Sequence, residues 1–565
     1  MVDPRGTRQH PSGRVHQVVA TRQGKRHQPG LSMNAKLEVH QVDVLVLGAG
    51  VAGYQAAIAA RRSGASVAIA GMAKGASPYI LGFNVAMPDG DDSADDFAED
   101  TYLGGYGLGE PSLIHAMAQE SWDAFEELYG YGVPFAMNGQ VPSFRHLSGS
   151  RRPRSVFVAS GTGNAIHRAL TGVAGDIGIE EILGWHVVRL IRVGNAVQGA
   201  VMRHRHEKRC MAVLANATVL ALGGLGRLYD ASTYPHDVSG SSYALALEAG
   251  ATLRDMEFVQ FEPTVIVDGP SVIRGMEMPT AMLGAGATLL NAQGERFMLR
   301  YNPASAETKI EKAKLALFIQ KEIDEGRGLA GGTVAFDARP LGREALQQYE
   351  THYRRLRSAG IDPATEVVRI APAAHSLMGG VEVDACLWSG VDGLFACGEA
   401  AGGVHGASRI AGNGAADAIV LSRRCGRFAY DMQIAADAST RAEAVELAEQ
   451  ELAASDPSPK HAAALSRIAS QLAESCGIHR SAAELQHATN VLAAIEDHES
   501  MEVRRSCMVA RSIVTAAALR DESRGAHFRR DFPHTNDTHW RKSIRSRLQE
   551  SRLLTSTNPA WDNGS

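Results

Sequence analysis

The chain has 565 residues, of which 45% are hydrophobic and 21% are charged, and its formal net charge is -5 at pH 7. This length allows several domains, and the composition is that of an ordinary globular protein. The mildly acidic balance argues against nucleic acid or an anionic membrane as the main partner. No apolar run in the sequence has the length of a membrane span.

The six cysteines are scattered and contain no C-x-x-C pair, which predicts free thiols in a cytoplasmic protein and no metal site. Residues 1–38 are polar and basic and contain no apolar segment, so a secretory signal is not expected there. We expect this stretch to be a disordered or non-native tail, with Met33 as an alternative start of the protein.

Residues 42–70, VDVLVLGAGVAGYQAAIAARRSGASVAIA, predict a buried strand, a glycine turn, an alanine-rich helix and a second strand. Gly48, Gly50 and Gly53 have the G-x-G-x-x-G spacing of a dinucleotide-binding turn. In such turns the first glycine allows the tight bend, the second admits a pyrophosphate, and the third lets the helix pack on the strand. A turn that serves packing alone is the alternative.

The acidic residue that usually binds the ribose is missing, because the second strand ends in Ala70 and Gly71. The dinucleotide must therefore be identified from later segments. Strands followed by glycine-rich turns recur at residues 212–226 and 372–425, on either side of a stretch of mixed short strands and a helix. A chain that leaves its dinucleotide domain and returns to it is typical of flavoproteins, in which the two segments meet on one FAD.

We therefore predict an α/β fold with a Rossmann-like FAD-binding domain, an inserted α+β capping domain and a C-terminal helical domain. The predicted parts are a tail at 1–38, the FAD-binding domain at 39–262 and 365–434, the capping or substrate domain at 263–364, and the helical domain at 435–565.

Several segments together resemble the succinate dehydrogenase/fumarate reductase flavoprotein family, which includes L-aspartate oxidase. They are ALGGLGRLY, EFVQFEPT, NAQGERFM, HSLMGG, GLFACGEAAGGVHGASRIAGN and DESRGAHFRRDFPHTNDTHW. The resemblance covers about residues 42–545 and implies FAD as the cofactor. The cofactor-binding residues that it implies are Gly48, Gly50, Val51, Ala52, Gly53, Ser77, Gly223, Gly224, Glu399, Asn413, Gly414 and Ala415.

Within that set, the resemblance places Glu399 at the sugar or ribitol hydroxyls and Asn413 to Ala415 at the flavin pyrimidine ring. A helix N-terminus at that ring stabilises the anionic reduced flavin. Respiratory members attach FAD covalently through a histidine that follows the serine of the loop after the second strand. Here Ser77 is followed by Pro78, which has no nucleophilic nitrogen. We therefore predict non-covalent FAD.

By the same resemblance, His375 and Arg409 occupy the positions of a histidine and an arginine that hold a dicarboxylate substrate. A guanidinium can bind a carboxylate through two hydrogen bonds and hold the adjacent carbon near flavin N5. A buried hydrogen-bonded histidine and a structural arginine ion pair are the alternatives.

Two other catalytic positions depart from the family. Glu262 replaces a histidine, and Lys312 replaces the catalytic arginine, with Lys309 and Lys314 as alternative positions for that replacement. We expect burial to lower the pKa of Lys312 and make it a base for proton transfer, whereas an exposed helix lysine is the alternative. Glu262 should repel a second substrate carboxylate, by about 4 kcal/mol at 4 Å and intermediate dielectric.

We therefore predict an FAD-dependent oxidoreductase that transfers hydride between flavin N5 and a small carboxylate-bearing substrate other than succinate or fumarate. A Met282-Leu283 wall beside Glu262 and Arg409 would suit one carboxylate and an apolar or amine-bearing end. L-aspartate oxidase and a non-catalytic accessory flavoprotein are the alternatives. An electron-transfer partner protein could face the C-terminal surface arginines, which are Arg529, Arg530, Arg541 and Arg545, and a solvated basic patch is the alternative.

Overall fold

The computed structural model describes residues 38–88, 90–147, 149–235, 237–435, 438–453 and 459–557. The chain divides into two units, Met1–Lys36 and Leu37–Ser565. The predicted tail lies outside the described residues except for its last position, and the elements of the fold belong to the second unit. Within the described ranges, no helix combines the length and the apolar character that crossing a membrane requires.

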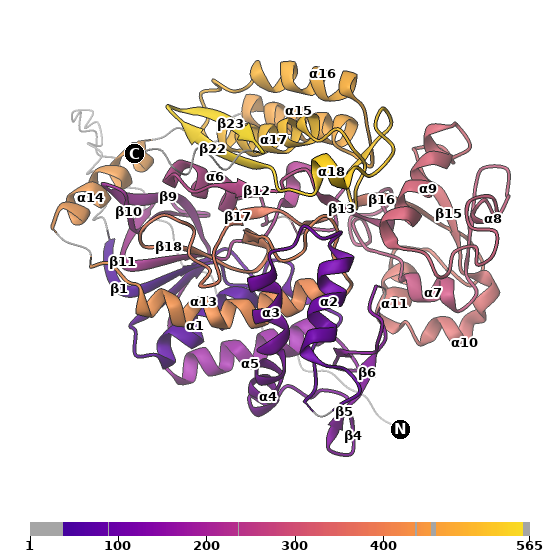
Figure 1. The fold of residues 1–565 in the computed structure, drawn as a ribbon, viewed down its shortest axis with the longest axis horizontal. Coiled ribbons are helices and arrows are strands. Elements are labelled where there is room, and N and C mark those ends of the chain that lie inside the picture. Colours follow the sequence, from indigo (N-terminus) through magenta and orange to yellow (C-terminus); the bar gives the residue numbers. More distant parts are fainter. Residues whose placement is uncertain are drawn as a thin grey trace, which may run out of the picture. The chain divides into compact units, whose positions relative to one another are not determined.

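A seven-stranded sheet, in the order β8-β2-β1-β11-β10-β9 with β18 beside β11, supports the FAD-binding segments (Figure 1). Strands β8, β2, β1, β11 and β18 run parallel to one another, and β10 and β9 form an antiparallel extension. Residues 44–47 of β1 are wholly buried, as expected for a parallel strand covered on both faces. The bounds are β1 (Glu38–Leu47), β2 (Val67–Gly71), β8 (Glu180–Leu183), β9 (Trp185–Val193), β10 (Ala196–His204), β11 (Cys210–Leu220) and β18 (Leu394–Ala396).

Helices from distant parts of the sequence cover one face of this sheet (Figure 1). They are α1 (Val51–Arg62), α5 (Thr162–Asp176) and α13 (Ser422–Asp431). A Cβ on Gly426 would lie 2.0 Å from the carbonyl oxygen of Ala56, so α13 and α1 approach each other to backbone contact. This contact brings the returning segment beside the first βαβ unit, as predicted.

Two helical stretches are interrupted. Residues 111–130 form α3 (Pro111–Gln119) and α4 (Ser121–Gly130), which are separated at Glu120, and the Ser121 hydroxyl donates a hydrogen bond to the carbonyl of Ala118. The stretch after residue 412 begins as α12 (Asn413–Ala416) and passes through a π-helical turn at Asp417–Leu421 before α13. Such turns occur often at functional sites.

The capping segment has its own four-stranded sheet, in the order β13-β16-β15-β14, and its own apolar core. The predicted boundary between residues 262 and 263 falls inside β13, because this strand continues from the FAD-binding segment into the capping sheet. Lys309, one of the alternative positions for the catalytic lysine, lies before α9 and has a φ of 51°, which is not helical. The bounds are β13 (Val259–Val265), β14 (Thr288–Leu290), β15 (Val334–Asp337), β16 (Val368–Leu377), α7 (Thr280–Gly284), α8 (Met298–Tyr301), α9 (Lys312–Asp324), α10 (Gly342–Gln347) and α11 (Glu350–Ser358).

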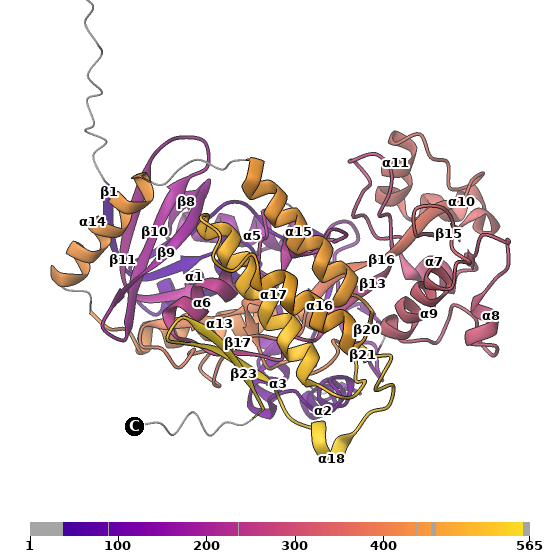
Figure 2. The ribbon, with the colours of Figure 1, turned by 90° about the horizontal axis from the view of Figure 1, so that it is seen from above.

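The C-terminal segment is not purely helical. Helices α15 (Pro459–Ser475), α16 (Ala482–Ala493) and α17 (Met501–Leu519) pack together, whereas α14 (Ala438–Ala453) lies against β9, β10 and β11 (Figure 2). Ala444 and Ala448 of α14 are buried there with side chains of the sheet. The last strands, β22 (Arg545–Gln549) and β23 (Arg552–Ser556), extend a five-stranded sheet in the order β19-β17-β12-β22-β23.

Shorter elements complete the described part of the chain. They are α2 (Ala94–Gly104), α6 (Ser241–Ala249), α18 (Asp537–Trp540), β3 (Phe83–Asn84), β4 (Met137–Asn138), β5 (Val141–Pro142), β6 (Phe144–Arg145), β7 (Ser155–Val156), β12 (Leu253–Arg254), β17 (Gly380–Glu382), β19 (Ala401–Gly402), β20 (His479–Arg480) and β21 (Phe528–Arg529).

Buried ion pairs join the C-terminal helices to the rest of the unit. The guanidinium of Arg520 lies 2.7 Å from the carboxylate of Glu257, and both side chains are wholly buried. Arg529, expected at the surface, is also buried and pairs with Asp531 at 2.8 Å. Arg529 is therefore unavailable to a partner protein, and the expectation for this residue is wrong.

Candidate active site

A continuous cavity of about 2340 Å³ lies at the carboxyl ends of the parallel strands and extends to the capping segment. This volume exceeds the roughly 300–1,000 Å³ of ordinary small-molecule pockets, so it has room for a dinucleotide and a substrate together. Three glycine-rich corners line it, at residues 48–52, at residues 223–224, and at Gly412, Gly414 and Ala415.

The first corner divides its glycines between packing and ligand access. A Cβ on Gly48 would lie 2.0 Å from the carbonyl oxygen of Ala221, and one on Gly53 would lie 1.8 Å from that of Gly48. Gly53 does not line the cavity, whereas Gly50, with Val51 and Ala52 of the helix start, does. These positions match the separate roles that the glycine spacing predicts.

Ser77 closes this corner from the loop after β2. Its Oγ accepts a hydrogen bond of 2.8 Å from the backbone N–H of Val51, and a Cβ on Gly50 would lie 3.1 Å from the same oxygen. Ser77 also lines the cavity. The loop therefore holds the helix start in place while leaving the cradle at Gly50 open.

The second corner meets Glu399, which follows the neighbouring parallel strand β18. A Cβ on Gly224 would lie 2.3 Å from the Glu399 carboxyl group, so a side chain there would displace that carboxyl group. The carboxyl group accepts hydrogen bonds from the Leu377 backbone N–H, at 3.0 Å, and from the Tyr234 hydroxyl. Burial raises the pKa of Glu399. Gly223, Gly224 and Glu399 all line the cavity, which places a buried acceptor beside the glycine turn.

The third corner is the start of α12. Gly414 and Ala415 line the cavity, but Asn413 does not. Its buried side chain accepts a hydrogen bond of 2.7 Å from Asn84 and donates one of 3.0 Å to Thr101. Asn413 therefore fixes the helix start to neighbouring elements, and Gly412, Gly414 and Ala415 line the cavity.

Buried polar atoms beside this corner have no hydrogen-bond partner among the described residues. They are Nδ1 of His405, Oδ1 of Asp417 and Nε of Arg409, and all three residues line the cavity. Nε2 of His405 lies 3.4 Å from Oδ2 of Asp417. Leaving such atoms buried and unsatisfied is costly, so they fit a ligand with its own donors and acceptors. The polar edge of a flavin ring is such a ligand.

An ion pair between a buried glutamate and a partly exposed lysine faces the cavity from the capping side. Nζ of Lys312, the first residue of α9, lies 2.6 Å from Oε2 of Glu262 on β13. Burial favours a raised pKa for Glu262, but the cations Lys312 and Arg409 hold that pKa below its usual value. Burial also favours a lowered pKa for Lys312, yet Glu262 and Glu277 raise it. The expectation that burial lowers the pKa of Lys312 is therefore wrong, because its partner is closer than the sequence revealed.

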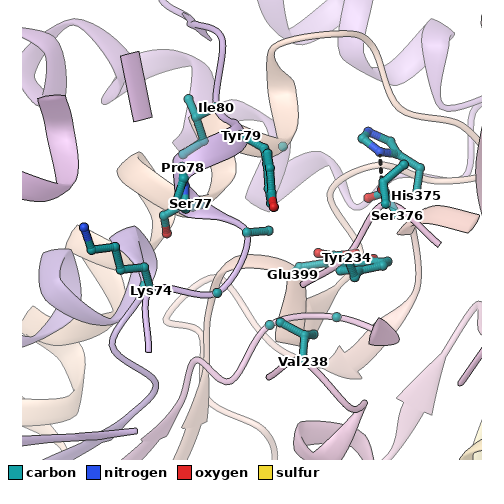
Figure 3. Close-up of a pocket in the computed structure, with 18 of the residues that line it drawn as sticks. Lys74, Ser77, Pro78, Tyr79, Ile80, Tyr234, Val238, His375, Ser376 and Glu399 are labelled. Atoms are coloured by element: carbon teal, nitrogen blue, oxygen red, sulfur yellow. Dashed lines mark hydrogen bonds between the residues drawn. The ribbon is translucent and has the colours of Figure 1, made fainter. Parts of the chain in front are cut away.

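His375, on β16, is a neutral imidazole in this site. Its Nδ1 lies 3.0 Å from the hydroxyl of Thr233, and burial lowers its pKa to about 3. Figure 3 shows His375 farther along the cavity from Glu399 and Tyr234, with the loop that contains Ser77 opposite. His375 therefore offers hydrogen bonds, and Arg409 supplies the positive charge.

Glu277 belongs to the same cluster and was missed from the sequence. The chain around it pairs with β13 at Val265, and its side chain lines the cavity. Burial and the charge of Glu262 raise the pKa of Glu277 to about 7. The available signal was a single acidic residue between Met276 and Met278 in an apolar segment.

The predicted apolar wall lies elsewhere. Met282 and Leu283 are buried in the core of the capping segment, and the cavity is lined instead by Met276, Thr280 and Ala281. The short helix α7 turns the larger side chains inward, away from the cavity.

Comparison with known protein families agrees with this geometry. Residues 43–415 match the FAD binding domain family, and residues 494–556 match the fumarate reductase flavoprotein C-terminal family. The first match alone covers more than half of the chain. The chain belongs to the succinate dehydrogenase/fumarate reductase flavoprotein family. The predicted α/β fold and the predicted FAD cofactor are thereby confirmed.

Relatives of this flavoprotein have different named activities. A fumarate reductase (CoM/CoB) subunit of Methanothermobacter marburgensis is 31% identical over 541 residues, covering 90% of this chain and 97% of that protein. L-aspartate oxidase of Mycobacterium tuberculosis is 32% identical over 508 residues, covering 87% and 93%. The flavoprotein is therefore an FAD-dependent oxidoreductase, and its substrate is a separate question.

Solved structures that are similar to this chain belong to the same family. The FrdA protein of E. coli quinol fumarate reductase superposes with a TM-score of 0.82 at 26% identity, covering 92% of this chain and 97% of that one. Mycobacterium smegmatis Sdh1 in complex with UQ1 superposes with a TM-score of 0.81 at 28% identity, covering 92% and 94%.

Proposed function

We propose that this flavoprotein transfers hydride between FAD and a small substrate that carries one carboxylate and is neither succinate nor fumarate. The observation that carries the proposal is the ion pair between the buried Glu262 and Lys312. It brings a protein carboxylate to the cavity and engages the cation that would otherwise attract a second substrate carboxylate. A dicarboxylate would meet Glu262 and Glu277 at its far end.

Arg409 and His375 are the proposed carboxylate-binding residues. Arg409 has a buried Nε without a hydrogen-bond partner among the described residues, and His375 is neutral and hydrogen-bonded to Thr233. A guanidinium group beside a neutral imidazole that donates a hydrogen bond can bind a carboxylate and fix its orientation. Orientation of the adjacent carbon is a large part of catalysis in such a site.

FAD, when bound, supplies a centre that accepts or donates hydride. The capping side supplies the proton. Lys312 is charged, because Glu262 and Glu277 raise its pKa, so it donates a proton in the reductive direction. Glu277, whose pKa is about 7, exchanges protons near neutral pH and can recharge this pair. In the oxidative direction the same carboxylates take up the proton.

Succinate and fumarate are expected to be poor substrates of the FAD-loaded protein, with turnover below about 1 per second under saturating dye mediator. The matched variant Glu262→His with Lys312→Arg reinstates the residues of the family pattern. We expect it to bind succinate at least tenfold more tightly than the wild type, measured by perturbation of the flavin spectrum. Wild-type turnover of either dicarboxylate at about 1–1,000 per second, the ordinary enzymatic range, would refute the proposal.

L-aspartate oxidase is the second candidate, favoured by relatives at 32% identity. It requires hydrogen peroxide formation from L-aspartate in air, which a peroxidase-coupled assay measures directly. Flavin that no carboxylic or amino acid reduces would favour the accessory flavoprotein. An electron-transfer partner and a cytoplasmic location remain predictions.

We further propose that FAD is held non-covalently. The position that carries a histidine in respiratory members is Pro78, and Ser77 before it is engaged with the Val51 backbone. Precipitation of the holoprotein with acid is expected to leave the yellow colour in the supernatant. A washed pellet that keeps its flavin absorbance would contradict this prediction.

A further inference from the structure

The charges that interact with one another around Glu262 leave one carboxyl group for a ligand. This cluster on the capping side of the cavity contains two carboxyl groups, Glu262 and Glu277, and one lysine, Lys312, which pairs with Glu262. Glu311, Lys314 and Glu350 also line the cavity, but their side chains are exposed. Arg409 interacts electrostatically with both carboxyl groups but carries the unpartnered Nε assigned above to the substrate carboxylate. Among the described residues, no cation pairs with Glu277 as Lys312 pairs with Glu262.

We propose that Glu277 and Glu262 form a binding site for a substrate ammonium group, so that the substrate is a zwitterion with one carboxylate on Arg409 and one ammonium at these glutamates. This inference rests on the proposed function and deepens it by naming the second polar group. It excludes dicarboxylates by charge, and it favours an amine over an uncharged tail.

The burial of Glu262 makes the site selective for an ammonium group over a carboxylate. The Glu262 side chain is 1% exposed, so its interaction with a nearby charge is weakly screened by water. A substrate carboxylate in this position would add a third negative charge. An ammonium group would complete two ion pairs, Lys312 with Glu262 and the substrate with Glu277. Burying a charge is tolerated when it is paired in this way.

Ammonium binding should be linked to the protonation of Glu277. In the free protein, burial and Glu262 raise the pKa of Glu277 to about 7, while Lys312 and Arg409 oppose that shift. His375 is neutral throughout this range because its pKa is about 3. A ligand ammonium favours the ionised carboxylate, so its affinity should rise by about tenfold between pH 6 and pH 8, with a proton released on binding below pH 7.

The test uses the FAD-loaded full chain and four-carbon probes that differ only in their polar groups. The probes are butanoate, 2-aminobutanoate, 3-aminobutanoate, 4-aminobutanoate and succinate, and their dissociation constants are measured by perturbation of the flavin spectrum. At pH 8, at least one aminobutanoate is expected to bind at least tenfold more tightly than butanoate. This ratio should fall at least tenfold in Glu277→Gln and recover in part in Glu277→Asp.

Glu311 provides a matched control, because it lines the same cavity but its side chain is 55% exposed. Glu311→Gln should leave the ratio unchanged. Equal binding of butanoate and every aminobutanoate, or a ratio that survives Glu277→Gln, would overturn the ammonium site while leaving a monocarboxylate substrate in place. Tighter binding of succinate than of butanoate and all aminobutanoates would overturn the proposed function itself.

Discussion

Gly48→Ala is expected to abolish FAD binding and to lower the free energy of unfolding by more than about 4 kcal/mol. Gly48 has a φ of 127°, which side chains rarely adopt, and its Cβ would lie 2.0 Å from the carbonyl oxygen of Ala221. The clash is between two backbone segments, β1 and the turn after β11, so it cannot be relieved by rotating a side chain. Flavin content per purified chain and the denaturation midpoint measure the result.

Gly178→Ala separates steric clash from backbone strain. Gly178 also has a positive φ, 72°, but nothing lies within 4 Å of its Cβ position. The expected cost is about 1–2 kcal/mol, the ordinary penalty of a left-handed residue, with flavin content unchanged. Equal effects of the two substitutions would show that strain alone explains the first, and a stable, yellow Gly48→Ala protein would refute the role of the turn.

Lys312→Met is expected to destabilise the fold by about 3–5 kcal/mol at pH 8, because it leaves the buried carboxylate of Glu262 without its partner. The double variant with Glu262→Leu replaces the pair by apolar groups and should return stability close to that of the wild type. Chemical denaturation of each variant at fixed FAD concentration measures the difference.

The loss of stability in Lys312→Met is expected to depend on pH. In the wild type, Lys312 holds the pKa of Glu262 below its usual value despite burial, so the pair stabilises the fold above about pH 4.3 and the effect is lost as the pH falls through the folded-state pKa. In Lys312→Met, burial raises the pKa of Glu262 instead. The destabilisation should then be greatest at high pH and shrink as Glu262 takes up a proton. A Lys312→Met protein as stable as the wild type at pH 8 would refute the ion pair between Lys312 and Glu262.

Local sequence patterns were sufficient to predict the first strand, glycine turn and helix of the FAD-binding domain. The strand, turn and helix from β1 to β2 follow one another within a short stretch, and hydrophobic spacing together with the glycine positions specifies that unit without distant contacts. The return of the chain to the same domain was also predictable, because a second parallel strand and a second glycine turn repeat the same pattern. The ends of helices were harder to predict from the sequence. The helix α9 begins at Lys312, after Lys309 takes a left-handed conformation.

The protonation states in the site depend on groups that are far apart in the sequence. Glu262 and Lys312 are 50 residues apart, yet their side chains form one ion pair. Sequence reasoning from burial alone therefore predicted the wrong direction for the pKa of Lys312. It also overlooked Glu277, since a single glutamate in an apolar segment has no periodic pattern to reveal its place. Asn413 likewise needed the fold, because its partners Asn84 and Thr101 come from other elements.

By itself, the sequence determined the α/β class and the glycine-rich turns of an FAD-binding domain, because these depend on short-range spacing and residue identity. Only the tertiary structure decided which charged groups lie close to one another at the cavity. The physical reason is that electrostatic energies depend on distance and burial in space, and the chain brings together at this cavity groups from β13, α9, β16 and the loop before α12.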